Sequence, residues 1–247
     1  MTLPGTEQWL VPEWQPHPRV RALITRRRGD YSPPPWQGFN LGDNCGDEPT
    51  RVAAARAHLH QRIGTAQPPF WLTQIHGVRS IQYGDADRHA DGVCSHQAGQ
   101  PCVVLTADCL PVLMARCDGS AVGAYHAGWR GLLAGMLEVG VKQLAPAGES
   151  LSVWLGPAIC RRCYQVGDEV RNAFVASDPT FAEGFREDGP GHWRMDMFAL
   201  ARQRLRAAGV TDIHGGTLCT SCLIDDFYSY RRDGQTGRFA TLIWLKD

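Results

Sequence analysis

The segment Ala121-Val122-Gly123-Ala124-Tyr125-His126-Ala127-Gly128-Trp129-Arg130-Gly131 decides the fold class of this chain of 247 residues. Residues 121–125 form an apolar run with the length of a buried β-strand. From residue 132 to residue 144, leucine, methionine and valine recur at helical spacing. A strand that turns directly into a helix is typical of α/β proteins, and His126 lies at that turn.

Strand-like and helical patterns also alternate on both sides of this segment. Asp47 is the expected N-cap of a first helix over 49–63, and Gly64 is its expected end. Residues 233–237, between two strand runs, predict a closing hairpin. We therefore expect a single α/β (α+β) domain over 1–247, with a mixed sheet covered by helices. The other expected elements are strands at 70–72, 102–105, 112–114 and 151–155, and helices at 132–144, 166–176 and 197–208.

Charge and composition narrow the functional classes. The chain has 25 basic and 25 acidic residues, so no net field attracts nucleic acid or a membrane surface. We interpret Arg26-Arg27-Arg28 as a solvated loop. Nine cysteines in a chain of this size fit a reducing compartment, and Met1-Thr2-Leu3-Pro4-Gly5 has no targeting pattern. We expect a soluble, cytoplasmic protein with no nucleic-acid or membrane partner.

Three residues at boundaries between strands and loops form a candidate metal site. They are His76 in Gln74-Ile75-His76-Gly77, Cys109 in Thr106-Ala107-Asp108-Cys109, and His126. Imidazole and thiolate donors suit zinc, and three protein ligands leave a fourth tetrahedral position for water or substrate. Histidine and cysteine are also common core residues, which is the structural alternative. Their glycine-containing and polar loop surroundings favour a site.

Neighbouring residues add chemistry to these loops. Gly128, Gly131, the helix N-terminus and the Arg130 guanidinium together suit a phosphate or carboxylate. The alternative is a tight turn in which Arg130 pairs with a core acid. Asp108 is a candidate general base, or a residue that orients a ligand. Adjacent side chains of a strand point to opposite faces, so Asp108 and Cys109 share a site only if the chain bends, and Pro111 is the candidate bend.

Two other groups of potential ligands need interpretation. Cys160-Arg161-Arg162-Cys163 and Cys219-Thr220-Ser221-Cys222 have the spacing of a four-thiolate zinc site. They lack the glycines expected after such ligands, so we favour reduced structural thiols. His58 and His60 lie two residues apart on the first expected helix and therefore on different faces. Their His-x-His spacing does not indicate copper binding.

A series of ordered motifs covers nearly the whole chain. They are Trp71-Leu72-Thr73-Gln74-Ile75-His76-Gly77, Ala90-Asp91, Thr106-Ala107-Asp108-Cys109-Leu110-Pro111-Val112-Leu113, residues 126–131, Leu155-Gly156-Pro157-Ala158-Ile159, Tyr164-Gln165-Val166-Gly167, residues 227–234, and Thr236-Gly237-Arg238. This series resembles the laccase-domain family, whose bacterial members are called polyphenol oxidase, purine nucleoside phosphorylase and peptidoglycan editing factor.

The resemblance implies a fold, a cofactor and a reaction. The implied fold is a layered α/β/β/α sandwich similar to a cysteine-hydrolase toxin, with Zn²⁺ held by His76, Cys109 and His126. The implied activities are phosphorolysis of adenosine, inosine, guanosine and methylthioadenosine, and deamination of adenosine. Two departures from the family pattern stand out. Residues 160–163 replace a glycine and a proline, and Gln165 stands where glutamate is usual.

The expected partners are purine nucleosides and phosphate, and the expected catalytic residues are His76, Asp108, Cys109 and His126. Asp91 or Asp108 is the candidate for proton transfer during deamination. A phosphate clamp would combine Arg130 with Arg231 or Arg232. The residues assigned to substrate binding are Asn40, Gln74, Asp91, Arg130, Arg231 and Arg232.

Three alternative functions remain open at this point. Cu²⁺ in the same site would give a copper-dependent polyphenol oxidase (laccase), although the chain lacks the several His-x-His ligands of a multi-copper enzyme. Without a metal, Cys109 and His126 would form a cysteine-histidine amidohydrolase or a cell-wall-precursor editing enzyme. The third alternative is a metal-stabilised protein that binds nucleotides or cell-wall precursors with little turnover.

Overall fold

Two β-sheets packed face to face form the centre of the structure, a computed structural model that describes residues 9–246. The N-terminal stretch 1–5, in which we expected no targeting pattern, lies outside the described residues. The first sheet is antiparallel, in the order β1 (Trp9–Leu10), β2 (Val20–Thr25), β13 (Phe239–Leu245) and β5 (Cys102–Thr106). The C-terminal strand β13 thus lies between two strands that precede it in the chain.

The second sheet is mixed and carries most of the candidate site. Its order is β12 (Asp212–Gly215), β8 (Leu151–Leu155), β6 (Leu110–Arg116), β7 (Val122–Ala127), β4 (Gly92–Ser95) and β3 (Ser80–Gln82). The two edge pairs, β12 with β8 and β3 with β4, are parallel, and the central pairs are antiparallel. The mixed sheet expected from the sequence is confirmed.

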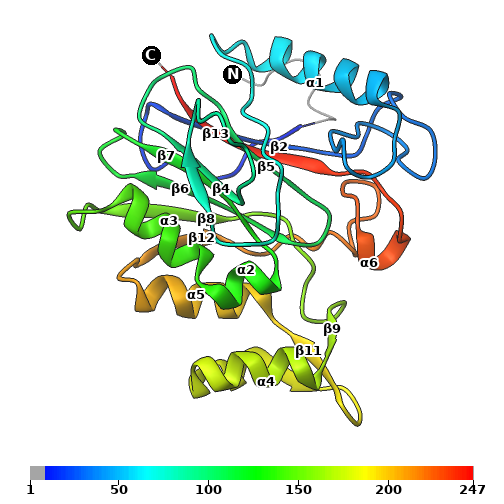
Figure 1. Ribbon diagram of the computed structural model, residues 1–247, viewed down its shortest axis with the longest axis vertical. Helices are drawn as coiled ribbons and strands as arrows, with labels where there is room; N and C mark the ends of the chain where they lie inside the picture. The colour runs from blue at the N-terminus through cyan, green and yellow to red at the C-terminus, as the bar shows by residue number, and fades with distance from the viewer. Residues whose placement is uncertain (1–8, 247) are drawn as a thin grey trace.

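Helices cover the outer faces of both sheets (Figure 1). Helix α1 (Pro49–Ile63) lies on the four-stranded sheet, while α2 (Trp129–Ala134), α3 (Met136–Leu144) and α5 (Met197–Ala207) lie on the six-stranded sheet. The order of layers is therefore α/β/β/α. A smaller sheet of β10 (Phe185–Glu187), β11 (His192–Met195) and β9 (Gln165–Gly167) packs with α4 (Asp168–Ser177) and η1 (Pro179–Gly184) at one end.

Alternation of apolar side chains along the central strands produces three hydrophobic layers. On β6, Leu110, Val112 and Met114 face the helices, whereas Leu113 and Ala115 face the other sheet. On β13, Phe239, Ile243 and Leu245 pack between the sheets, whereas Ala240 and Leu242 pack under α1. The strands are buried on both faces, which explains why their sequences are continuous apolar runs.

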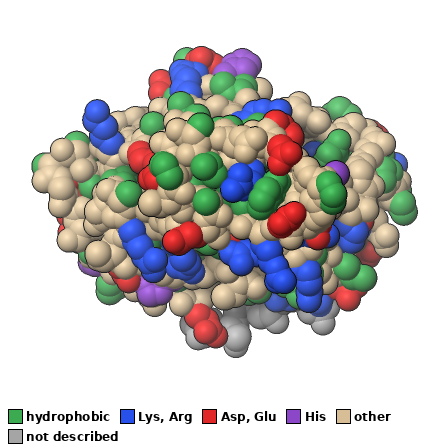
Figure 2. Space-filling model, turned by 90° about the horizontal axis from the view of Figure 1, so that it is seen from below, with side chains coloured by type: hydrophobic (Ala, Val, Ile, Leu, Met, Phe, Trp, Pro, Cys, Tyr) green, Lys and Arg blue, Asp and Glu red, His purple; other side chains and the backbone are tan. Residues whose placement is uncertain are grey.

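The end of the molecule that carries the small sheet mixes charges of both signs. Figure 2 shows basic and acidic side chains together on the face at this end. Ion pairs account for part of the mixture, including Arg194 with Asp188 and Arg161 with Asp196. In the described part of the chain, no helix combines the length and apolar character needed to cross a membrane.

Several expected elements differ in detail from the structure. The first helix has the expected bounds and ends at Gly64, but Asp47 does not cap it, because its carboxylate accepts hydrogen bonds from Ser32 Oγ at 2.5 Å and Asn40 Nδ2 at 2.9 Å. The helix expected over 132–144 begins earlier and is split by Gly135, whose φ of 98° ends α2. The strand expected at 70–72 is reduced to one bridge between Phe70 and Cys102.

The expected C-terminal hairpin is wrong. Residues 230–233 form the short helix α6 (Tyr230–Asp233), and β13 pairs with β2 and β5 and not with a strand that directly precedes it. The turn residues after α6 lead the chain into β13. This return places Ser229, Tyr230 and Arg231 near the ends of β5 and β6, where the candidate site lies.

Candidate metal centre and active-site cavity

Three separate segments of the chain bring His76, Cys109 and His126 together. His76 precedes β3, Cys109 lies between β5 and β6, and His126 lies near the end of β7. Their potential ligand atoms all lie within 4.8 Å of one another. The two imidazole rings meet edge to face, with centroids 4.8 Å apart and an interplanar angle of 83°. The structure thus assembles the three residues that the sequence singled out.

Asp91 lies behind His126 and organises the site from a fully buried position. Its carboxylate accepts a hydrogen bond from His126 Nδ1 at 2.8 Å. It also accepts hydrogen bonds from the backbone N–H groups of Ile75, His76 and Gly77, at 3.3, 3.0 and 2.7 Å respectively. Burial acts to raise the pKa of Asp91, but these hydrogen bonds, with the one from His126 foremost, lower it. The ionised carboxylate therefore directs His126 Nε2 toward the other two ligands.

The turn that presents Cys109 is built on Asp108. Asp108 has a φ of 96°, a region that non-glycine residues rarely adopt. Its carboxylate accepts hydrogen bonds from Thr220 Oγ1 at 2.6 Å, Ser229 Oγ at 3.0 Å and the N–H of Arg231 at 2.7 Å. These contacts hold the strained backbone in place. The expected bend at Pro111 is wrong, because Pro111 is paired within β6 and the chain bends at Asp108.

The electrostatics of the cluster favour a charged pair. Burial opposes ionisation of Cys109, but His126, followed by His76, lowers the pKa of its thiol to about 6. Burial likewise opposes protonation of His126, but the Cys109 thiolate and the Asp91 carboxylate raise the pKa of His126 to about 9. A thiolate and two imidazoles are the form in which this cluster binds a divalent cation.

Gly128 allows the backbone to pass close to the cluster. A Cβ at this position would meet Cys109 Sγ at 3.0 Å and His76 Cδ2 at 3.3 Å. Both contacts are shorter than ordinary van der Waals contact, so any larger residue would push the ligands apart. Glycine is therefore needed here for close approach.

A cavity of about 440 Å³ opens over the three ligands. This volume lies in the range typical of small-molecule sites. Its walls combine aromatic, aliphatic and cationic side chains from several loops. They include Leu72, Gln74, Leu105, Trp129, Ile159, Tyr164, Met197, Tyr230, Arg231 and Arg238.

The structure separates the expected substrate-binding residues into two groups. Gln74 and Arg231 line the cavity. Gln74 also braces the wall, because its amide exchanges two hydrogen bonds with the backbone of Leu105, at 2.7 and 2.9 Å. The Arg231 guanidinium donates to the carbonyl of Gln165 at 2.7 Å and lies over the ring of Tyr164.

The other expected residues lie away from the cavity lining. Asn40 is fully buried, and its amide is satisfied by Asp47 and by the backbone of Gly42 and Arg238. Arg232 donates to the carbonyls of Thr220, Ser221 and Phe227. These contacts hold the surrounding loops together. Asp91 acts on the site only through His126 and the backbone of residues 75–77.

Arg130 does not occupy the place expected for a phosphate clamp. It is exposed, and its guanidinium stacks on Trp129 with Cζ 4.4 Å from the ring centroid. The helix it belongs to has only six residues, so the expected dipole contribution is small. The arginines that line the cavity are Arg231 and Arg238.

Sequence reasoning missed several cavity residues, namely Trp129, Tyr164, Tyr230 and Arg238. All four occur within the motifs quoted above, but nothing in their spacing showed that they would face one cavity. Gln165, which departs from the family pattern, lies on β9 and donates to Asp188 Oδ2 at 2.6 Å, outside the cavity lining.

Comparison with known proteins identifies the family. Residues 21–246 match the family model described as multi-copper polyphenol oxidoreductase laccase. The chain belongs to this family. Proteins similar to this chain over nearly its whole length carry a different name. A purine nucleoside phosphorylase of Pseudomonas aeruginosa is 46% identical over 97% of this chain and 99% of its own length. Purine nucleoside phosphorylase YfiH of Escherichia coli is 44% identical over 96% of this chain and 98% of its own.

Solved structures of the family share the fold. A crystal structure of a Neisseria meningitidis protein aligns with a TM-score of 0.92 and 40% identity, covering 98% of this chain and 100% of that one. YlmD from Geobacillus stearothermophilus aligns with a TM-score of 0.87 and 30% identity, covering 98% and 97%. The fold and family expected from the motifs are confirmed.

The residues of the cluster fit a single metal ion. A tetrahedral ion with nitrogen at about 2.0 Å and sulfur at about 2.3 Å places its ligand atoms roughly 3.5 Å apart. The observed upper limit of 4.8 Å is close enough for small side-chain movements to complete such a set. The donors are a thiolate and two imidazoles, one already oriented by Asp91.

The ligands for several coppers are not assembled in residues 9–246. In that range the only group of three or more potential ligands that contains histidine is the cluster of His76, Cys109 and His126. His58 lies among the rings of Trp9, Tyr31 and Phe39, and His60 contacts the carbonyl of Thr65. The described residues therefore do not provide the several groups of ligands that the term multi-copper in the family description implies.

Proposed function

We propose that this protein is a zinc-dependent purine nucleoside phosphorylase that also deaminates adenosine, built as one functional domain over 1–247. The observation that carries the proposal is the position of His76, Cys109 and His126 beneath a cavity with aromatic and cationic walls. The names of the Pseudomonas and Escherichia relatives support the reaction. The proposed nucleosides are adenosine, inosine, guanosine and methylthioadenosine.

His76, Cys109 and His126 would hold the zinc ion, because soft thiolate and imidazole donors in a tetrahedral arrangement suit Zn²⁺. When bound, zinc supplies a Lewis acid with a vacant position, which can polarise a substrate atom or activate water. Asp91 keeps His126 in the tautomer and orientation that present Nε2. Asp108 keeps Cys109 in place between β5 and β6 through its contacts with Thr220 and Ser229.

The cavity walls suit a nucleoside and an anion. Trp129, Tyr164 and Tyr230 offer aromatic faces for a purine ring. Arg231 and Arg238 line the same cavity and provide guanidinium donors for phosphate oxygens. Positive charge develops on the ribose during phosphorolysis, so holding the phosphate beneath the sugar is the main contribution required of these residues.

A second function uses the same residues without metal. The lowered pKa of Cys109, near 6, and the His126–Asp91 contact of 2.8 Å give the arrangement of a nucleophile, a base and an orienting acid. A cysteine amidohydrolase of this kind would be inactivated by alkylation and unaffected by removal of metal. The zinc phosphorylase would lose activity on chelation.

One experiment separates these functions. The protein is purified without added metal, its zinc content is measured, and adenosine is incubated with and without phosphate. We expect the His76–Cys109–His126 cluster to hold zinc, adenine to form only when phosphate is present, and inosine to form in either case. Absence of adenine and inosine from metal-loaded protein at high enzyme concentration would contradict the proposal.

A further inference from the structure

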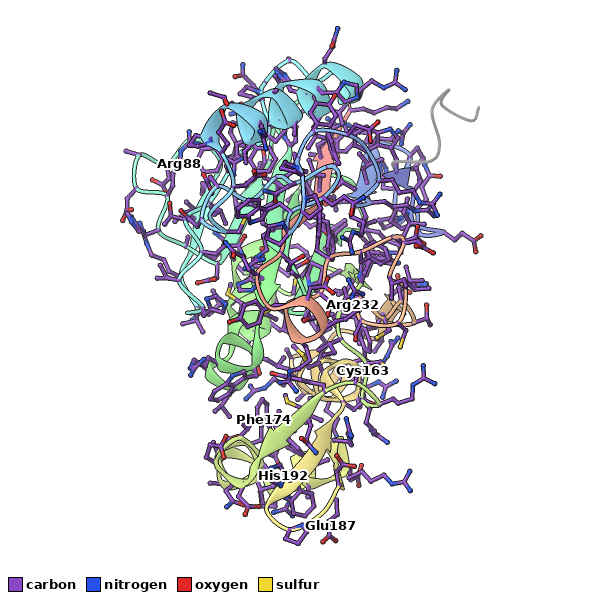
Figure 3. All side chains as sticks on the ribbon, turned by 90° about the vertical axis from the view of Figure 1, so that its right-hand side faces the viewer. Arg88, Cys163, Phe174, Glu187, His192 and Arg232 are labelled. Carbon is purple, nitrogen blue, oxygen red and sulfur yellow. The ribbon has the colours of Figure 1, made fainter. Side chains whose placement is uncertain are left out.

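A second cluster of sulfur atoms lies at the surface junction between the sheets and the β9–β11 end of the molecule. It consists of Cys160, Cys163, Cys219 and Cys222, whose sulfur atoms all lie within 4.8 Å of one another. Cys163 and Cys222 are in contact, with their sulfurs 3.4 Å apart. Figure 3 labels Cys163 and Arg232 at the level where the β9–β11 end joins the body. The four thiols form a group separate from the His76–Cys109–His126 site.

The backbone fixes the two Cys-x-x-Cys turns against each other. Ala158 and Cys219 form a parallel bridge, with the N–H of Ala158 donating to Leu218 O and the N–H of Thr220 donating to Ala158 O, both at 3.1 Å. The N–H of Cys160 donates to Cys219 Sγ at 3.4 Å. Two segments 59 residues apart in the chain are therefore held so that their sulfur atoms converge. Two unrelated pairs of structural thiols would not require this convergence.

The spacing of the sulfurs matches a tetrahedral site better than a disulfide. A disulfide requires a sulfur separation of about 2.05 Å, whereas all nine cysteines are free and the sulfurs of Cys163 and Cys222 are 3.4 Å apart. Zinc–sulfur bonds of about 2.3 Å place tetrahedral ligands roughly 3.8 Å apart. The 3.4 Å between Cys163 and Cys222 and the upper limit of 4.8 Å for the whole set lie on either side of that value.

Basic groups around the cluster offset the charge that such a site would carry. Four thiolates around a divalent ion leave about two negative charges. Arg162 Nη2 lies 3.1 Å from Cys222 Sγ. Arg232 Nη1 donates to the carbonyls of Thr220 at 3.0 Å and Ser221 at 3.2 Å, within the second turn. Arginine at both turns is the charge pattern that stabilises a thiolate-rich metal site.

We propose that Cys160, Cys163, Cys219 and Cys222 bind a zinc ion that joins the two turns. Four protein ligands leave no open position, so this zinc is structural and not catalytic. Both turns continue into the cavity wall. The first supplies Ile159 and Tyr164, and the second leads to Tyr230 and Arg231. The bound ion would hold these walls at a fixed separation. This inference depends on the geometry of the four cysteines alone and not on the proposed reaction.

The test measures zinc stoichiometry in protein purified without added metal. Native mass spectrometry of the wild type should show two zinc ions. Replacing the other site with C109S and H126A should leave one zinc, with X-ray absorption showing four sulfurs at about 2.3 Å. C160S with C222S should also leave one zinc. C117S, which removes an exposed cysteine outside both clusters, should retain two.

The C109S/H126A result does not depend on the phosphorylase proposal, because this variant lacks two ligands of the His76–Cys109–His126 site and its metal content is read without any substrate. No zinc in C109S/H126A, nitrogen ligands in its spectrum, or a disulfide within the four cysteines would overturn the proposal. If a variant does not fold, alkylation of the wild-type protein followed by peptide mapping tests the proposal instead. The four cysteines should resist iodoacetamide until a chelator is added. Free alkylation in zinc-loaded protein would overturn the proposal.

Discussion

Asp91 accepts a hydrogen bond of 2.8 Å from Nδ1 of His126 while its other contacts fix the backbone of the loop that carries His76. One buried carboxylate thus positions two of the three candidate ligands. Because it acts through the ligands, its removal should weaken metal binding more than it weakens the fold.

Replacing Asp91 with asparagine tests this positioning role. We expect D91N to bind zinc about 10- to 100-fold more weakly, the range found when partners of metal ligands are lost. Competition with a chromogenic chelator gives the affinity. D87N is the matched control, because Asp87 is an exposed carboxylate that contacts His89 and Arg79 outside the site. Equal zinc affinity in D91N and the wild type would show that Asp91 does not orient His126.

Replacing Gly128 with alanine tests the close approach of the turn to the ligands. The new Cβ would meet Cys109 Sγ at 3.0 Å and His76 Cδ2 at 3.3 Å, so we expect lower zinc affinity with a modest loss of stability. G77A is the control, because its Cβ would come no closer than 3.6 Å to any neighbour. Isothermal titration of both metal-free variants measures the difference. Equal affinities would count against the crowding argument.

Alkylation of metal-free protein tests the state of Cys109. Its pKa of about 6 means that the reactive thiolate persists at neutral pH and is lost as the pH falls through 6. Cys117 is the internal control, since burial and the nearby Asp212 and Asp118 raise its pKa. We expect iodoacetamide to modify Cys109 far faster than Cys117 at pH 7, and zinc to protect it. A slower reaction of Cys109 than of Cys117 at pH 7 would contradict the lowered pKa of the Cys109 thiol.

Comparison of R231A with R232A separates ligand binding from structural support. Arg231 lines the cavity, so R231A should raise the apparent KM for phosphate about 10-fold or more, as expected for loss of a charged hydrogen bond. Arg232 holds three carbonyls, so R232A should instead lower the free energy of unfolding by about 1–3 kcal/mol. R130A should change KM little, because Arg130 is exposed and stacked on Trp129. Steady-state kinetics and urea unfolding distinguish these effects.

Local patterns in the sequence predicted the elements whose partners lie nearby in the chain. The apolar run before His126 was enough to place β7, and the spacing after residue 131 predicted a helix there, although the structure begins this helix at Trp129 and splits it at Gly135. The position of β13 could not be predicted this way, because it pairs with β2 and β5, which lie more than one hundred residues earlier. Turn residues at 233–237 suggested a hairpin, and only tertiary contacts show where that turn leads.

The candidate ligands were predictable because each of these imidazole and thiolate groups lies next to glycine or a polar residue where an apolar strand run gives way to a loop. The direction of long side chains was not predictable. Arg231 and Arg232 are neighbours in sequence, yet one lines the cavity and the other supports the turn after Cys219. The convergence of the four thiols also depended on the bridge between Ala158 and Cys219, which no local pattern indicates.

The central claim is that zinc held by His76, Cys109 and His126 is required for phosphorolysis, and one measurement tests it most directly. Adenine release from adenosine and phosphate is followed for wild-type protein, for chelator-treated protein, and for that protein after zinc is restored. We expect phosphate-dependent adenine release that disappears with the metal and returns with zinc, and none from H76A. Undiminished adenine release by protein shown to contain no metal would contradict it.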